Sequence, residues 1–243
     1  MRLSGNTILI TGGASGIGLG LATRLMSENR VILCGRNREK LTRAVHDYPQ
    51  LEYIACDLSH PEERVQLART VVQKYPELNI LINNAGIQRR VPLTTNEEWD
   101  HTHEELAINL EAPIHLTRLL TAHLSLSPAA AVINVSSGLA FVPMAMMPIY
   151  CASKAALHSY TLSLRMALEK DGIEVIEIIP PAVNTDLGGK GLHDFGVPLA
   201  EFCDAAILGL REGRKEIAYG SSLRSSLASR QELDGIFEAM NRG

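Results

Sequence analysis

Long apolar runs and clustered basic residues are both missing from this sequence of 243 residues. The apolar run near the start is only Ile8-Leu9-Ile10 before a Thr-Gly turn, too short for a signal peptide or a membrane span. Basic residues occur in short pairs such as Arg89-Arg90, which argues against a nucleic-acid partner. We therefore expect a cytoplasmic protein that binds neither nucleic acid nor membrane.

Metal-type spacing is also missing. The sequence has four cysteines, which are Cys34, Cys56, Cys151 and Cys203. None of them forms a C-x-x-C pair or a zinc pattern, and Cys34 and Cys56 lie in strand-like runs, where free cysteine is usually a small buried hydrophobe. His101 and Glu105 would share a helical face, but without a third ligand a solvated face is favoured. We expect no metal site and a reducing compartment.

Strand-like and helical patterns alternate along the whole chain, with 46% hydrophobic and 21% charged residues and a net charge of −4. The expected strands are 7–11, 31–34, 51–56, 79–83, 130–136, 174–179 and 216–220. The expected helices are 16–29, 37–47, 61–75, 97–126, 148–170, 198–212 and 231–240. No linker or repeat interrupts this order. It predicts one α/β domain over residues 1–243, a doubly wound Rossmann-type fold with a parallel sheet of about seven strands and helices on both faces.

The segment "TGGASGIG" (11–18) follows the first expected strand and opens the first helix. Gly12, Gly16 and Gly18 permit a tight turn and close approach of a pyrophosphate, and the helix N-terminus favours an anion. The alternative is a merely tight strand-to-helix turn. The strand-turn-helix context favours a dinucleotide site.

The end of the second strand bears on the cofactor. Gly35 occupies the position where an acidic residue would bind the ribose of NAD, and Arg36 follows it. A guanidinium suits the 2′-phosphate of NADP, whereas an aspartate would repel it. Ser15 and Asn37 would add neutral donors. The sequence predicts NADP(H) in preference to NAD, against the alternative that Arg36 is only a surface residue.

Polar residues follow the third and fourth strands. Asp57 would either accept from the adenine amino group or cap the next helix, which begins near Pro61. "INNAG" (82–86) would hold the strand ends together and form the floor of the cofactor site.

"IYCASKAAL" (149–157) places Tyr150 and Lys154 one helical turn apart. Read alone, such a pair is usually a surface contact. Carbonyl reduction, however, needs a proton donor, and a nearby ammonium lowers the pKa of a phenol. Ser137 lies thirteen residues before Tyr150 and would stabilise developing charge on the substrate oxygen.

With "NNAG", Asn109 in "AINLEAP", Ser137 in "NVSSGLA" and the late "PPAVNT", these motifs resemble the short-chain dehydrogenase/reductase family over essentially the full length. The resemblance implies a catalytic tetrad of Asn109, Ser137, Tyr150 and Lys154, with Asn109 helping to place a water and Ser136 structural. It also implies a set of cofactor contacts: Gly12, Ser15, Gly16, Ile17, Gly18, Arg36, Asp57, Leu58, Asn84, Ala85, Gly86, Tyr150, Lys154, Pro180, Val183 and Thr185. The start "LSGNTILITGG", "PPAVNTDL" and "IFEAMNR" look most like the branch named for the lipoteichoic-acid D-alanylation operon.

Several segments on the expected substrate side can be interpreted in more than one way. Pro181 replaces the family's usual glycine, which stiffens the turn and removes a backbone donor. Gly188, Gly189 and Gly191 suggest a mobile lid. The methionine-rich segment 141–147 would line a pocket, or else belong to the core or a subunit contact. Trp99 would lie near the site or pack a helix.

The resemblance implies a short-chain oxidoreductase that transfers a hydride between NADP(H) and a small carbonyl or alcohol substrate, with Tyr150 as acid/base. Two alternatives remain at this point. One is a reductase of 3-oxoacyl thioesters on a carrier protein, which would want a clearer basic docking patch. The other is a non-catalytic NADP-binding redox sensor, which would have no need of Tyr150 or Lys154. A homodimer or homotetramer is expected, as is common in the family.

Overall fold

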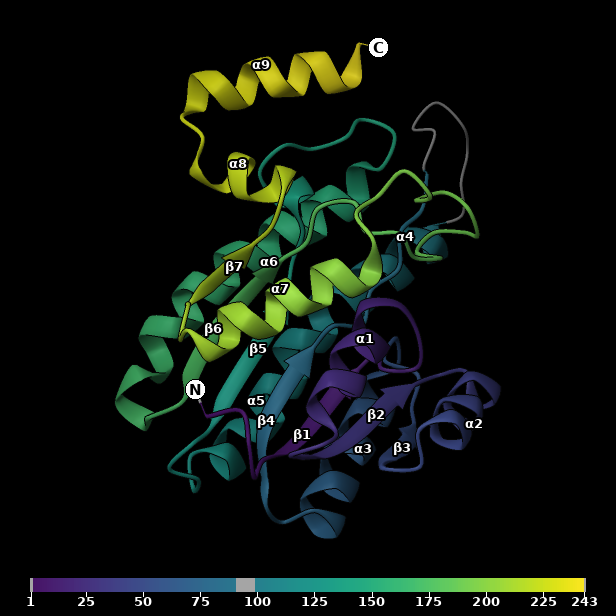
Figure 1. Ribbon diagram of the computed structural model, residues 1–243, viewed down its shortest axis with the longest axis vertical. Coiled ribbons are helices and arrows are strands. Elements are labelled where there is room, and N and C mark those ends of the chain that lie inside the picture. The colour runs from purple at the N-terminus through teal and green to yellow at the C-terminus, as the bar shows by residue number, and fades with distance from the viewer. Residues whose placement is uncertain (1, 91–98, 243) are drawn as a thin grey trace.

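The computed structural model describes residues 2–90 and 99–242. Its centre is a seven-stranded, entirely parallel sheet in the order β3-β2-β1-β4-β5-β6-β7 (Figure 1). The strands are β1 (Thr7–Thr11), β2 (Arg30–Gly35), β3 (Leu51–Ala55), β4 (Leu78–Asn83), β5 (Ala131–Val135), β6 (Glu174–Ile179) and β7 (Glu216–Ala218). The expected α/β fold with helices on both faces is therefore confirmed.

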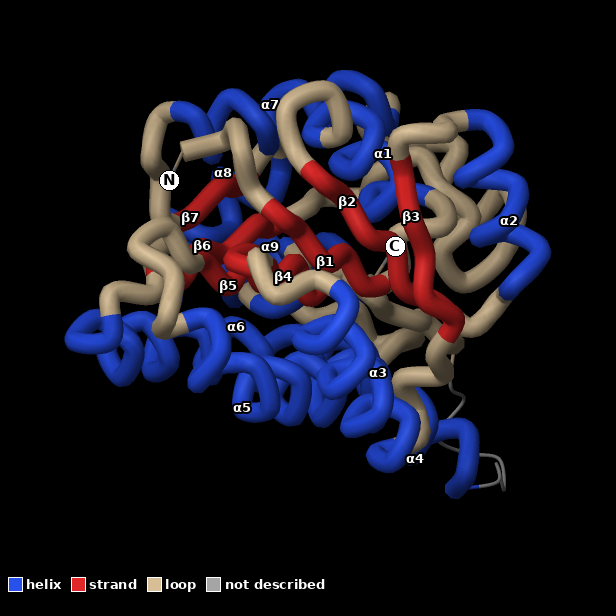
Figure 2. Tube along the Cα trace, turned by 90° about the horizontal axis from the view of Figure 1, so that it is seen from below, coloured by secondary structure: helices blue, strands red, loops and turns tan. Residues whose placement is uncertain are grey.

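The helices are α1 (Gly16–Leu25), α2 (Arg38–Asp47), α3 (Pro61–Lys74), α4 (Trp99–Leu106), α5 (Ala112–Leu124), α6 (Pro148–Leu168), α7 (Leu199–Arg211), α8 (Ser221–Leu227) and α9 (Arg230–Asn241). Most of them cover the two faces of the sheet (Figure 2), whereas α8 and α9 lie beyond one end of it (Figure 1). In Figure 2, α3, α5 and α6 lie below the sheet, and α1, α2 and α7 lie above it. No helix of the described residues has the length and apolarity needed to cross a membrane.

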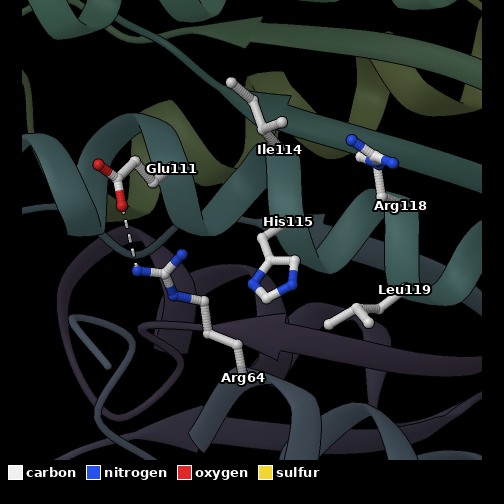
Figure 3. Close-up of a pocket in the computed structure, with 6 residues that line it drawn as sticks. All are labelled: Arg64, Glu111, Ile114, His115, Arg118 and Leu119. Atoms are coloured by element: carbon white, nitrogen blue, oxygen red, sulfur yellow. Dashed lines mark ion pairs between the residues drawn. The ribbon is translucent and has the colours of Figure 1, made fainter. Parts of the chain in front are cut away.

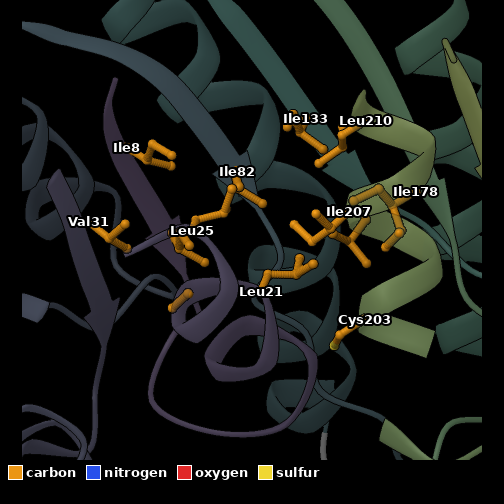
Figure 4. Packing of buried hydrophobic residues seen from close by; sticks show 14 of the residues in the cluster. Ile8, Leu21, Leu25, Val31, Ile82, Ile133, Ile178, Cys203, Ile207 and Leu210 are labelled. Atoms are coloured by element: carbon orange, nitrogen blue, oxygen red, sulfur yellow. The ribbon is translucent and has the colours of Figure 1, made fainter. Parts of the chain in front are cut away.

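Burial on both faces explains the near-continuous apolar strands. All residues of β1, β4 and β5 are buried, as parallel sheets covered on both sides require. One core cluster joins the sheet to α1 and α7, and Figure 4 draws part of it, including Ile8, Leu21 and Ile178. A second cluster joins the opposite face to α3, α5 and α6. The two cores hold the strand ends rigidly at one edge.

The strand order reverses at β1, which pairs with β2 on one side and with β4 on the other. In doubly wound sheets, ligands bind at such a switch point, outside the carboxyl ends of the strands. The loops after β1, β2, β4, β5 and β6 all emerge at that edge. The fold thus brings the predicted motifs toward one place.

The expected helix over 97–126 is interrupted, and residues 97–98 of that range lie outside the described residues. A π-helical turn, η1 (Ala107–Glu111), separates α4 from α5. Pro113 has no N–H for the carbonyl of Asn109 four residues earlier, so the α-helical bonding pattern cannot continue. The N–H of Ala112 bonds instead to the carbonyl of Ala107, five residues earlier.

Other expectations at the element ends also needed correction. The first helix ends at Leu25 rather than near Asn29, because Asn29 accepts the backbone N–H of Asn6 and is held in the turn before β2. Helix α8 was not expected. Trp99 is 70% exposed, so it packs no helix. His101 is exposed, but Glu105 is fully buried, so the two do not share a solvated face.

Candidate active site

The turn between β1 and α1 is closed by glycines because side chains do not fit there. A Cβ on Gly18 would lie 2.4 Å from the carbonyl oxygen of Gly12 and 2.5 Å from Nδ2 of Asn84. Gly12 and Gly16 have φ values of 64° and 54°, the left-handed region that favours glycine. Ser15 precedes α1 without a side-chain capping bond. The first N–H groups of α1, including that of Ile17, therefore face an exposed turn suited to an anion.

The asparagine after β4 ties this turn to the neighbouring strand end. Asn84 Nδ2 donates to the carbonyl oxygens of Thr11 at 2.9 Å and Gly12 at 3.2 Å. The Oγ1 of Thr11 accepts the backbone N–H groups of Asn84 and Ala85, both at 3.0 Å. These bonds fix the floor between β1 and β4 that the "INNAG" sequence led us to expect.

Arg36, just after β2, lies beside two carboxylates. Its Nη1 is 2.5 Å from Oε1 of Glu104 and 3.8 Å from Oδ2 of Asp57. Glu104 also pairs with Arg89, a second arginine that no sequence pattern predicted at this place. Partial burial acts to raise the pKa of Glu104, but hydrogen bonds from Arg36 and Arg89 hold that pKa below its usual value.

Asp57 is engaged within its own turn. Its Oδ1 accepts the backbone N–H of Ser59 at 2.9 Å and the Ser59 hydroxyl at 2.7 Å. Partial burial acts to raise the Asp57 pKa, but the bonds from Ser59 lower it on balance. The residue before α3 is His60, which makes no side-chain cap. Of the two alternatives, capping of this helix by Asp57 is therefore wrong. Leu58, next in the chain, is buried.

Tyr150 and Ser137 meet where β5 ends and α6 begins. Tyr150 is 5% exposed and Ser137 is 7% exposed. Burial raises the pKa of Tyr150 to about 12, although the neighbouring Ser137 hydroxyl acts in the opposite direction. Ser137 also accepts the N–H of Leu139 as it caps a short 3₁₀ turn, η2 (Gly138–Ala140). The neighbouring Ser136 is buried, and its hydroxyl has no hydrogen-bond partner among the described residues.

Lys154 is buried one turn further along α6. Its Nζ donates to the carbonyl oxygen of Val135 at 2.8 Å and lies 5.8 Å from the centroid of the Tyr150 ring. Burial lowers the Lys154 pKa to about 8, while the buried carboxylate of Glu177 acts to raise it. We expected the ammonium to lower the phenol pKa. In this structure burial of the phenol dominates instead.

Asn109 sits in the π-helical turn and is fully engaged with protein groups. Its Oδ1 accepts the N–H of Ile87 at 2.9 Å, and its Nδ2 donates to the carbonyl of Ile87 at 2.9 Å. Nδ2 also lies 3.2 Å from the Ser153 hydroxyl of α6. A Cβ on Gly86 would lie 3.4 Å from Asn109 Oδ1 and 3.5 Å from Lys154 Nζ. The segment after β4 therefore runs directly over Asn109 and Lys154.

An apolar wall surrounds Tyr150. Met147, Tyr150 and Cys151 form a buried cluster, against which three half-buried residues pack: Leu139, Met144 and Leu187. Two methionines of the segment 141–147 thus border the phenol, while Met146 is 47% exposed. Part of the segment therefore packs in the same core cluster as Tyr150, and whether it also lines a substrate pocket stays a prediction.

The loop after β6 closes the opposite side. The carbonyl of Pro180 accepts the N–H of Gly138 at 2.8 Å, and Val183 is buried and bridges Val197. Thr185 lies against the first turn, where a Cβ on Gly16 would be 3.5 Å from its Cγ2. A Cβ on Gly188 would lie 3.1 Å from the carbonyl oxygen of Gln88. The glycine-rich loop therefore reaches across to the segment that follows β4.

Two features near the site were not expected from the sequence. Beyond Lys154 on α6, His158 Nδ1 lies 2.9 Å from Oε2 of the buried Glu177. Ser222 of α8 donates to the carbonyl of Ile179 at 2.5 Å, and a Cβ on Gly138 would lie 3.0 Å from its Cβ. Neither contact had a sequence signal, because each joins residues distant in the chain.

A separate open pocket lies away from these motifs. It has a volume of about 590 Å³ and is lined by Arg64, Glu111, Ile114, His115, Arg118 and Leu119 (Figure 3). None of the predicted catalytic or cofactor-binding residues lines it. Within residues 2–90 and 99–242, no three potential metal ligands gather at one place.

Comparisons with known proteins agree with this geometry. A family model described as short chain dehydrogenase matches residues 6–194. The uncharacterized oxidoreductase DltE of Bacillus subtilis (strain 168) is 42% identical over 248 aligned positions, covering 99% of this chain and 98% of that protein. A tropinone reductase homolog of Arabidopsis thaliana is 31% identical, covering 82% of this chain and 78% of its own.

Solved structures show the same fold. A short-chain dehydrogenase from Burkholderia cenocepacia J2315 in complex with NADP has 26% identity and a TM-score of 0.84, covering 98% of this chain and 99% of its own. One from Sphingobium yanoikuyae in complex with NADPH has 24% identity and a TM-score of 0.79, covering 96% and 93%. With glycine turn, asparagines, serine, tyrosine and lysine at one sheet edge, the chain belongs to the short-chain dehydrogenase family of oxidoreductases.

Proposed function

We propose that this protein interconverts a carbonyl and an alcohol with NADP(H), and that Tyr150 exchanges the proton. The observation that carries the proposal is the burial of the Tyr150 phenol and the Ser137 hydroxyl at one site, one helical turn from the buried ammonium of Lys154. In this chemistry the carbonyl carbon accepts a hydride and the carbonyl oxygen accepts a proton. The cofactor and the proton donor must therefore reach the same carbonyl group. The site offers two hydroxyls for the oxygen and, at the same edge of the sheet, the glycine turn for the cofactor.

The cofactor assignment rests on the fit of this chain's residues to a dinucleotide phosphate. Gly12 and Gly18 leave a cradle that a Cβ would fill, and the N-terminus of α1 opens onto it. Arg36 stands after β2, where a 2′-phosphate would need a cation. The NADP and NADPH complexes of related structures point the same way. When bound, the nicotinamide supplies or accepts the hydride.

The protonation states of Tyr150 and Lys154 suit proton donation to a carbonyl oxygen near neutral pH. A phenol pKa of about 12 means that Tyr150 holds its proton, which is the form that donates to a carbonyl oxygen. The Ser137 hydroxyl would hold that oxygen and stabilise charge as it develops. Lys154, with a pKa of about 8, remains largely charged at pH 7 and would steady the phenolate that forms after transfer.

Asn109 acts in this proposal as a positioning residue. Because its amide holds both backbone groups of Ile87, it fixes the chain that runs from Gly86 over Lys154. The apolar wall of Met144, Met147 and Leu187 favours a carbonyl with an apolar substituent over a highly charged one.

The deciding experiment replaces Tyr150 by Phe, which keeps the ring and removes the proton. We expect a loss of turnover of about 100-fold or more, since a positioned acid/base contributes roughly 10² to 10⁴. NADPH binding should persist because the phosphate cradle is untouched. Oxidation of NADPH is followed with a panel of ketones, aldehydes and 3-oxoacyl thioesters.

Tyr160→Phe is the matched control, because Tyr160 lies on the same helix and packs in the second core cluster. That variant should keep its turnover. Full activity of Tyr150→Phe would refute the role of the phenol. Wild-type protein that binds NADPH but does not oxidise it with any substrate in the panel would instead favour a redox sensor.

A further inference from the structure

Two arginines and one glutamate from distant parts of the chain meet beside the expected adenosine end of the cofactor groove. Arg36 follows β2, Arg89 lies in the segment after β4, and Glu104 is on α4. Nη1 of Arg36 is 2.5 Å from Oε1 of Glu104, and Nη2 of Arg89 contacts Oε2 of the same carboxylate. We call Arg36, Arg89 and Glu104 the arginine–glutamate cluster.

The cluster is held in place from one side and open on the other. Nη1 of Arg89 also donates to the carbonyl of His101 at 2.8 Å, which fixes that arginine on α4. The side chain of Arg36 is 51% exposed, whereas those of Arg89 and Glu104 are 29% and 25% exposed. Ion pairs this accessible to solvent are weak, so an anion in solution can replace the carboxylate.

Charge within the cluster favours a doubly charged anion. Two guanidinium groups face one carboxylate, and the second carboxylate, Asp57, is 3.8 Å from Arg36 but already accepts two bonds from Ser59. Each guanidinium has five N–H donors, and the described hydrogen bonds of Arg36 use only its Nη1. A phosphate monoester offers three oxygens and about two charges, which suits two guanidinium forks better than one carboxylate does.

We propose that Arg36 and Arg89 together form the binding site for the 2′-phosphate of NADP, and that Glu104 is the carboxylate this phosphate displaces. Arg89 is then the second cation that Arg36 alone does not supply. Glu104 is a specificity-determining residue, because it sets how strongly the phosphate is preferred over a ribose hydroxyl. The phosphate's identity rests on the proposed function, whereas the anion site itself does not.

Removal of the competing charge should therefore strengthen phosphate binding selectively. In Glu104→Gln, a neutral amide of the same size no longer neutralises the arginines. We expect binding of adenosine 2′,5′-bisphosphate to tighten by roughly 3- to 10-fold, and that of adenosine 5′-monophosphate to change little. Arg89→Gln should weaken bisphosphate binding by a similar factor, again with little effect on the monophosphate.

Isothermal titration calorimetry of the full-length protein measures both ligands without any turnover. Glu62→Gln, on the exposed first turn of α3, controls for the general change in charge. Arg90→Gln controls for Arg89, because Arg90 is its exposed neighbour. Thermal denaturation of each variant reports whether the cluster has only a stabilising role.

The outcomes separate this inference from the proposed function. Opposite shifts in Glu104→Gln and Arg89→Gln, confined to the bisphosphate, support the two-arginine site even if no carbonyl is reduced. Unchanged or weaker bisphosphate binding in Glu104→Gln overturns it, even in a protein that oxidises NADPH. The inference is also overturned if the wild-type protein binds neither ligand. It is overturned as well if a lower melting temperature is the only change in the variants.

Discussion

Lys154 carries a positive charge although it is buried, and burial disfavours the charged form of a lysine. It is 3% exposed, its ammonium donates to a single backbone carbonyl, and burial lowers its pKa from 10.5 to about 8. Glu177 works against this effect from β6, where the ring of His158 holds its carboxylate. The site therefore keeps a lysine that the fold alone would not favour. Such residues commonly trade stability for activity.

We predict that Lys154→Met stabilises the protein at pH 7 and abolishes its activity. Methionine fills a similar volume, and the buried charge disappears. The fall in pKa from 10.5 to about 8 corresponds to about 3 kcal/mol, and loss of the bond to Val135 offsets part of this gain. Thermal denaturation of the variant and of wild type at pH 7 measures the gain.

The sign of the pH dependence follows from the direction of the shift. Between pH 8 and 10.5, Lys154 is protonated more often in the unfolded chain than in the folded protein. The destabilising effect of Lys154 is therefore full below about pH 8 and vanishes toward pH 10.5. The advantage of Lys154→Met should therefore shrink as pH rises. Lys190→Met, at an exposed position, should show no such trend. A lower melting temperature for Lys154→Met at pH 7 would contradict the argument.

Residues that carry chemistry within one short segment could be predicted from sequence, and their long-range partners could not. Tyr150 and Lys154 share a helical face, and their spacing from Ser137 is visible in the sequence. By contrast, Glu104, the partner of Arg36, is 68 residues away in the chain. His158 lies on α6, and its partner Glu177 lies on strand β6. Ion pairs of this kind depend on how loops close at the sheet edge, which no local pattern encodes.

At the scale of elements, α8 links the last strand to the turn that holds Ser137. Ser222 is 1% exposed, donates to the carbonyl of Ile179 and accepts the N–H of Tyr219 at 3.0 Å. It also packs on Gly138, the residue after Ser137. Although short and rich in serine, α8 forms part of the floor beneath the site.

We expect Ser222→Ala to lower the free energy of unfolding by about 1–3 kcal/mol, because it leaves a buried carbonyl and a buried N–H without their partner. The melting temperature should fall by roughly 2–10 °C. Ser225→Ala, on the same helix, removes only an exposed bond and should change little. An equal loss in both variants would show that α8 has no special contact at this point.

The central strands could be predicted closely because β1, β4 and β5 are mostly apolar runs buried on both faces. The break in the long helix was also encoded, since Pro113 stands where an N–H is needed. Helix α8 was beyond prediction, because "SSLRSSL" has no apolar periodicity and its position depends on Ser222. The glycine-rich loop lies next to Gln88, in the segment that follows β4. That this loop is mobile stays a prediction.

For the whole molecule, binding at the switch point should stabilise every layer that meets there. NADPH at about 100 times its dissociation constant should add about 2.7 kcal/mol to the free energy of unfolding. That corresponds to roughly 5–10 °C in melting temperature for a chain of this size. NADH at the same concentration should give a smaller shift, and Arg36→Gln should reduce the NADPH shift to the NADH value. Differential scanning fluorimetry makes the comparison, and equal shifts for wild type would contradict the role of Arg36.

The strand order has a consequence for how the chain is made. After β1, the sheet grows outward through β2 to β3, returns once to the free edge of β1 with β4, and then extends through β5 and β6 to β7. Each later strand joins an edge that already exists, so none has to insert between paired neighbours. A nascent chain leaving the ribosome can therefore assemble its phosphate cradle first. The side that holds Ser137 and Tyr150 follows, and Ser222 closes the floor only after β7 has been made.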